Sequence, residues 1–132
     1  MPLSFESKIE KELMDFHHEA MGYTDIGDSF KSLKYPKEDI QEQYQKAFLI
    51  EKRVALFFKN KPNFEPTRSI FFLSAASLAI NAELWDEARE MIRLGIKFHQ
   101  CPGEIRDQMV ELLKQIPEEK RADDALSRQS TL

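Results

Sequence analysis

The sequence predicts an all-α fold of about five helices packed as antiparallel hairpins. Apolar residues recur every three or four positions through most of the 132 residues, which is the spacing of one face of an α-helix. No segment alternates apolar and polar residues as a half-buried strand does. Ten phenylalanines and a hydrophobic fraction of 42% supply enough apolar surface for one core. We therefore expect a single helical domain over residues 1–117 and a polar tail over 118–132.

The first predicted helix covers residues 5–21. Its apolar residues recur at helical spacing, and Gly22 is a residue type that commonly ends a helix. Beyond it the helical spacing is lost around Gly27 and Pro36. The sequence therefore predicts an irregular connection over residues 23–39, which is longer than most loops inside a compact domain.

The second predicted helix covers residues 40–58, where an apolar stripe continues until Pro62 ends it. Thr67 is placed to cap a third helix, which runs to about residue 82. The residues of this third helix are apolar or small on nearly every side. That pattern is typical of a central helix with neighbours on more than one face.

Two shorter helices are predicted towards the end of the chain. The apolar stripe of the fourth helix begins at Leu84 and reaches Gly95, and that of the fifth covers residues 105–116 before Pro117. The tail over 118–132 is polar and of mixed charge. We expect it to be a frayed helix end followed by solvated chain.

The third and fourth predicted helices share a characteristic spacing of small and aromatic residues. Small side chains let the two helices of a hairpin approach closely, and an aromatic residue fills the gap at the turn. The residues with this spacing are Phe72, Ala76, Ala79, Trp85, Ala88, Ile92 and Gly95. This segment resembles one tetratricopeptide repeat, although Pro102 falls later than the proline that usually closes such a repeat.

A fainter copy of the repeat lies upstream. Tyr44, Ala47 and Glu51 resemble the second helix of an earlier repeat, whose first helix would be residues 5–21. The order of segments is also similar to that of a group of small uncharacterised bacterial proteins. The tetratricopeptide resemblance implies a right-handed array of about two hairpins and a closing helix. It also implies a concave face that binds a peptide or another protein.

Glu51 is the charged residue that the apolar pattern singles out. A regular helix places its carboxylate in the middle of the stripe formed by Ala47, Phe48, Val54, Ala55 and Phe58. A buried carboxylate needs a hydrogen-bonded cation, and Arg68 at the start of the next helix is the natural candidate. The first interpretation is a buried ion pair that fixes the register of the helices. The alternative is a pair that contacts a ligand in an open cleft.

The third predicted helix carries small polar residues on one side. Ser74, Ser77 and Asn81 share that side and are candidates for contacting a peptide or protein partner. Small polar residues in a helix also permit close packing and bond to nearby carbonyl groups, so this second interpretation stays open. Aromatic residues near Phe57 and Phe64 favour self-association as a further possibility.

Metal-binding and catalytic patterns are weak in this chain. His17 and His18 are adjacent and diverge by about 100° on a helix, so both are expected to face solvent. His99 and Cys101 form too small a set for a metal site, and Cys101 has no identifiable base that would make it a nucleophile. We therefore expect no catalytic residue, no metal and no cofactor.

The composition excludes several classes of partner. A net charge of -4 and a pI near 5.4 disfavour nucleic acid, and no apolar run reaches the length of a membrane-spanning helix. The charged N-terminal segment is unlike a secretion signal, so a cytoplasmic protein is expected. The sequence thus favours a non-enzymatic adaptor or regulator that binds another protein or peptide, with homo-oligomers also possible. The alternative is a small helical enzyme or ligand-binding protein that uses a cleft between Glu51 and Arg68.

Overall fold

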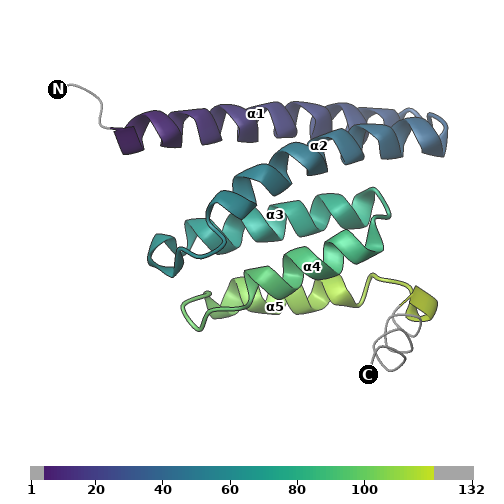
Figure 1. Ribbon diagram of the computed structural model, residues 1–132. Helices are drawn as coiled ribbons and strands as arrows, with labels where there is room; N and C mark the ends of the chain where they lie inside the picture. Colours follow the sequence, from purple (N-terminus) through teal and green to yellow (C-terminus); the bar gives the residue numbers. More distant parts are fainter. Residues whose placement is uncertain (1–4, 121–132) are drawn as a thin grey trace.

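The protein is all-helical over residues 5–120, which are the residues that the computed structural model describes (Figure 1). These residues contain no strand. A short 3-10 turn, η1 (Pro62–Phe64), separates the second helix from the third. The α-helices are α1 (Phe5–Ser32), α2 (Lys37–Phe57), α3 (Thr67–Asn81), α4 (Trp85–Gly95) and α5 (Gly103–Leu113). The prediction of an all-α fold with about five helices is confirmed.

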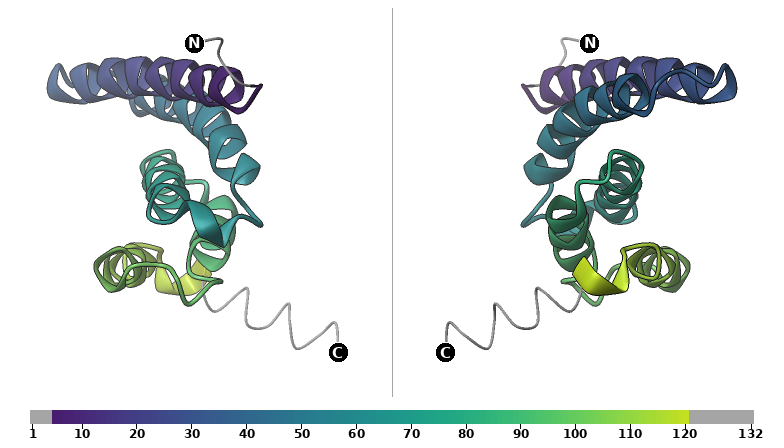
Figure 2. Two further views of the ribbon diagram at one scale, coloured as in Figure 1. Left: turned by 90° about the vertical axis from the view of Figure 1, so that its left-hand side faces the viewer. Right: turned by 90° about the vertical axis from the view of Figure 1, so that its right-hand side faces the viewer.

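Consecutive helices run antiparallel, so the chain forms two hairpins followed by α5 (Figure 1). Viewed along the stack, α3 and α5 lie on one side and α4 lies on the other (Figure 2). The turn between α1 and α2 projects beyond the other helices in both views (Figure 2). Within the described residues, no helix is both long and apolar enough to cross a membrane.

Helix α3 is the centre of the core, as its sequence predicts. It packs against α2, α4 and α5, and nine of its residues are buried. Ala75, Ala76 and Ala79 are fully buried, so their small side chains let the neighbouring helices come close. Gly95 at the end of α4 has the same effect, because an added Cβ would lie 3.0 Å from the Cβ of Phe72.

The predicted irregular connection over residues 23–39 is wrong. Helix α1 continues to Ser32, and only four residues separate it from α2. Gly22 and Gly27 are both inside the helix. Gly27 leaves room for the neighbouring helix, because an added Cβ would lie 2.9 Å from Cε1 of Tyr44 on α2. Gly27 therefore allows two helices to approach closely and does not end a helix.

Helix α1 instead ends in a Schellman motif. Lys34 has a φ of 59°, the amide of Tyr35 donates to the carbonyl of Phe30 at 2.9 Å, and the amide of Lys34 donates to that of Lys31 at 3.2 Å. The rings of Phe30 and Tyr35 stack with their centroids 4.2 Å apart, which supplies the apolar contact typical of this motif. Leu33 is left pointing into solvent, with 68% of its surface exposed.

Helix α3 ends in the same way. Glu83 has a φ of 59°, and the amide of Leu84 donates to the carbonyl of Ala79 at 2.8 Å. The amide of Glu83 donates to the carbonyl of Ile80 at 3.0 Å. Both hairpins therefore turn through one backbone motif, although neither has the glycine that this motif usually carries.

The start of α3 differs from the prediction. Pro66 occupies the position before the helix, and Thr67 makes no capping hydrogen bond. Glu65 caps the helix instead, since its carboxylate accepts a hydrogen bond of 2.9 Å from the amide of Ser69 and another from the Ser69 hydroxyl. An acidic side chain at a helix N-terminus satisfies free amides and suits the helix dipole.

Helix α5 begins two residues before the predicted fifth helix and ends three residues before it, at Leu113. Ile116 beyond it is nevertheless buried, at 1% exposure, so the chain stays packed on the core after the helix ends. Most of the predicted polar tail, residues 121–132, lies outside the described residues.

Candidate functional site

Glu51 is fully buried, as its place in the apolar stripe of α2 predicts. Its carboxylate accepts hydrogen bonds from Nδ1 of His17 on α1, at 2.9 and 3.0 Å, and from the hydroxyl of Ser74 on α3, at 2.6 Å. One carboxylate thus joins three helices. We call these three residues the Glu51 network.

The predicted pair between Glu51 and Arg68 is wrong. Arg68 is also fully buried, but its hydrogen bonds go to main-chain carbonyl groups and not to Glu51. His17 supplies the hydrogen-bond partner in its place, with 23% of its side chain exposed, so its predicted orientation towards solvent is also wrong. His18 is exposed, as predicted.

The His17 contact could not be read from spacing because it joins residues 34 positions apart. The rings of His17 and Phe71 also meet edge to face, with ring centroids 5.3 Å apart. These contacts depend on how α1 lies across α2 and α3. A histidine on the apolar side of α1 was the only signal in the sequence that could have suggested it.

The Glu51 network contains a serine, a histidine and an acid, but it does not have the geometry of a nucleophilic triad. In such a triad the histidine bonds to the serine and the acid orients the histidine. Here both Ser74 and His17 bond to Glu51, which occupies the central position. The arrangement holds a buried carboxylate in place, with no hydrogen bond between His17 and Ser74 among the described residues.

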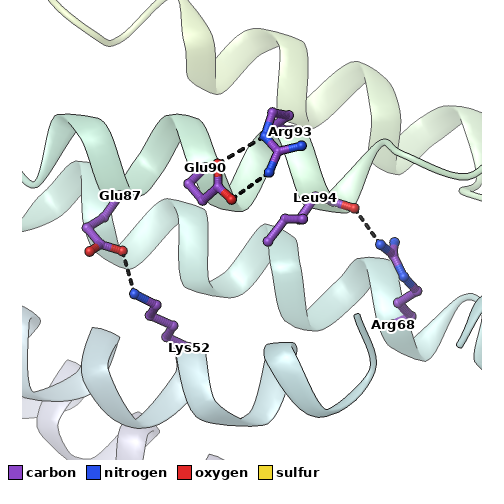
Figure 3. Close-up of polar contacts among 6 residues, drawn as sticks. All are labelled: Lys52, Arg68, Glu87, Glu90, Arg93 and Leu94. Carbon is purple, nitrogen blue, oxygen red and sulfur yellow. Dashed lines mark hydrogen bonds and ion pairs between the residues drawn. The ribbon is translucent and has the colours of Figure 1, made fainter. Parts of the chain in front are cut away.

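Arg68 fastens the start of α3 to the end of α4 (Figure 3). Its guanidinium donates to the carbonyl of Leu94, to that of Gly95 at 3.0 Å and to that of Lys59 at 3.2 Å. The last carbonyls of a helix have no partner within the helix, so Arg68 caps α4. Burial lowers the pKa of Arg68, and the charges of Glu65 and Cys101 act in the opposite direction.

Two aromatic rings enclose the same guanidinium. Its central carbon lies 4.9 Å from the ring centroid of Phe72 and 4.7 Å from that of Phe98. These contacts stabilise a charge that is removed from water. Because Glu51 and Arg68 are each satisfied by separate groups, the predicted cleft between the two charges is not formed.

Helices α2 and α4 are joined by a more exposed ion pair. Nζ of Lys52 lies 2.8 Å from a carboxylate oxygen of Glu87, while Glu90 and Arg93 pair along the outer face of α4 (Figure 3). Both pairs are partly exposed to solvent. Each therefore contributes little to stability.

The predicted binding face on α3 is divided by the structure. Ser74 is half-buried and bonds to Glu51, so it belongs to the core, as the packing interpretation holds. Asn81 is exposed, and Ser77 is half-buried. Ile70, with 48% of its surface exposed, lies on the same open side of α3.

Ser77 lines a hollow between α3 and α5 with a volume of about 370 Å³. Leucines from both helices give it apolar walls, and two carboxylates of α5 also line it. The lining residues are Leu73, Ser77, Asp107, Gln108, Glu111 and Leu112. We call this hollow the α3–α5 groove.

A second hollow of about 290 Å³ lies between α1, the end of α2 and the start of α3. It is lined by Glu10, Leu13, Met14, Phe58, Phe64, Thr67 and Phe71. Met14 and Phe64 are 41% and 39% exposed. The sequence suggested Phe64 as an exposed aromatic residue but gave no sign that α1 completes a hollow around it.

No metal site is apparent in the described part of the chain, where no three His, Cys, Asp or Glu residues are grouped to hold an ion. Cys101 is buried and His99 is exposed, so the two do not form a pair of ligands.

Comparison with known proteins found no matching family model, no matching curated protein and no matching solved structure. The resemblance to a tetratricopeptide repeat therefore rests on the residues of the α3–α4 hairpin.

Proposed function

We propose that this chain is a non-enzymatic protein-binding module whose partner, a peptide or protein segment, contacts the open side of α3 and the α3–α5 groove. The observation that carries the proposal is the groove itself. Leu73 and Leu112 give it apolar walls, while Ser77, Asp107 and Gln108 surround them with polar groups. Protein interfaces combine apolar and polar side chains in the same way.

The position of the groove supports the same proposal. Helix α3 is buried on its other sides by α2, α4 and α5, which hold it rigidly. A binding face on a fixed helix needs little ordering when a partner arrives, so less of the interaction energy is lost. The tetratricopeptide-like spacing of the α3–α4 hairpin is consistent with this role. The acidic composition and the expected cytoplasmic location are consistent with it too.

Site-specific photo-crosslinking tests the proposal. A photoreactive phenylalanine analogue is placed at Ser77 in the groove or, as a control, at Arg93 on the outer face of α4, and adducts formed in cells are identified by mass spectrometry. We expect a reproducible protein adduct from position 77 that is absent from position 93. Equal adducts from both positions, or none from position 77, would contradict a binding role for the groove.

A further inference from the structure

We propose that the α3–α5 groove accepts the α1–α2 turn of a second copy of this chain. The turn in question is formed by Lys31, Leu33, Lys34 and Tyr35, and we call it the α1–α2 tip. The inference rests on the proposed function, because it uses the same groove and names one occupant for it. It accounts together for two features that the fold does not explain, an exposed apolar tip and an acidic apolar hollow.

The tip has the shape and the apolar surface of an inserting element. It projects beyond α3, α4 and α5 in both views of Figure 2. Leu33 is 68% exposed and Tyr35 is 44% exposed. The Schellman motif and the ring stack on Phe30 hold the tip in one conformation, so its insertion into a groove would cost little ordering.

The tip also presents positive charge. Among the described residues, Lys31 and Lys34 have neither a hydrogen bond nor an ion pair from their side chains, whereas Lys37 pairs with Glu83 at 3.1 Å. Lys34 has a φ of 59°, a conformation in which glycine is favoured over other residues. A lysine at this position therefore adds a charge without improving the turn.

The groove has the complementary chemistry. Leu73 and Leu112 form apolar walls, and Asp107 and Glu111 lie one turn apart on α5. Glu111 accepts a bond of 2.9 Å from Lys114, but both side chains are about two-thirds exposed, at 67% and 66%. Asp107 has no side-chain partner within the described residues.

Insertion of the tip would pair these features. Leu33 would lie against the leucine walls, and Lys34 would meet Asp107 and Glu111 at the edge. The contact involves only one turn of chain, so it is smaller than the interface of a stable dimer and the association should be weak and dependent on concentration. A partner of the module would compete with the second copy for the groove.

Sedimentation velocity from micromolar to millimolar concentration tests the inference. We expect the average mass of the wild-type protein to rise with concentration, and less so at high salt because the charges are screened. Leu33→Asp, Lys34→Glu and Asp107→Lys should each weaken association by about tenfold or more. The double variant Lys34→Glu/Asp107→Lys should restore it, since the charges are then exchanged.

A control variant separates this contact from net charge. Glu90→Lys on α4 makes the same change in charge as Asp107→Lys, at a site away from the groove. It should associate like the wild type. A wild-type protein that stays monomeric at millimolar concentration, or a double variant as weak as the single ones, would overturn the inference.

Mixed disulfide formation locates the contact. A chain with Leu33→Cys should form a disulfide with a second chain carrying Ser77→Cys, and not with one carrying Arg93→Cys; the native Cys101 is buried, at 5% exposure. Equal yields from both pairs would also overturn the inference. The proposed function is tested separately in the Leu33→Asp variant, because this substitution leaves the groove intact. An adduct from position 77 should persist in that variant if the groove binds another protein.

Discussion

The two hairpins of this protein turn through the same backbone motif but treat their apolar residues differently. Lys34 and Glu83 occupy equivalent left-handed positions at the ends of α1 and α3. Ala82, just before Glu83, is buried in the core, whereas Leu33, the equivalent residue just before Lys34, stays in solvent. Local hydrogen bonding fixes the shape of a turn, but neighbouring elements decide whether its apolar side chains are buried.

The hairpins are also held by different polar contacts. Arg68 joins α3 to α4 through the carbonyl groups of Leu94 and Gly95, and it also bonds to the carbonyl of Lys59 just after α2. The first hairpin is joined to α3 through the Glu51 network. The second hairpin should therefore keep its structure when the first one is loosened, and the following substitutions test this difference.

Arg68→Met should have the largest effect on stability. It leaves the carbonyl groups of Lys59, Leu94 and Gly95 without their partner in a buried site, and we expect a loss of about 3 to 5 kcal/mol. Urea denaturation measures this loss. Arg93→Met is the control, since its side chain is 61% exposed and its loss should be within about 0.5 kcal/mol. Similar losses from the two variants would contradict a capping role for Arg68.

Glu51→Ala should cost less in total but loosen the first hairpin selectively. The substitution leaves His17 and Ser74 unpaired and creates a cavity, for an expected loss of about 2 to 4 kcal/mol. Hydrogen exchange should quicken in α1 more than in α4. His17→Ala should act in the same direction and the exposed His18→Ala should not. If hydrogen exchange became faster by the same factor along the whole chain, the two hairpins would not be held by separate polar contacts.

Two glycine substitutions within α1 should act in opposite directions. Gly27→Ala brings a Cβ to 2.9 Å from the Tyr44 ring, so a loss of about 1 to 3 kcal/mol is expected from overpacking. Gly22→Ala meets no atom within 4 Å and should stabilise the helix by up to about 1 kcal/mol. Thermal unfolding of both variants checks the signs. If both variants were stabilised, the close approach of α1 and α2 would be disproved.

The last prediction concerns Tyr44 at alkaline pH. Burial, together with the hydrogen bond to Asp28 of 2.6 Å and the charge of Asp28, raises the pKa of Tyr44 to about 12 from 10.0. Because the folded state holds this proton more tightly, its stabilising contribution is complete below pH 10 and is lost as the pH rises to about 12. The wild type should thus lose stability over this range relative to Tyr44→Phe. If the stability of the two proteins changed in parallel with pH, this contribution of Tyr44 would be refuted.

Much of the fold could be predicted because periodicity is a local property. The apolar spacing located all five helices and identified α3 as central, and the position of Glu51 within its stripe indicated burial. The prediction failed at Gly22 and Gly27, which both lie inside α1, and only Gly27 makes room for a neighbouring ring. A glycine that ends a helix and a glycine that admits a neighbouring ring look the same in a sequence.

The sequence by itself determined the apolar stripe that each helix turns inward, because that stripe follows from the geometry of the helix itself. The tertiary structure decided which buried groups meet. Arg68 was the predicted partner of Glu51, yet the packing of α1 against α2 brings His17 to Glu51, and the end of α4 brings its last carbonyl groups to Arg68. Hydrogen bonds act over about 3 Å, so a partner is chosen by how the helices pack and not by separation along the chain.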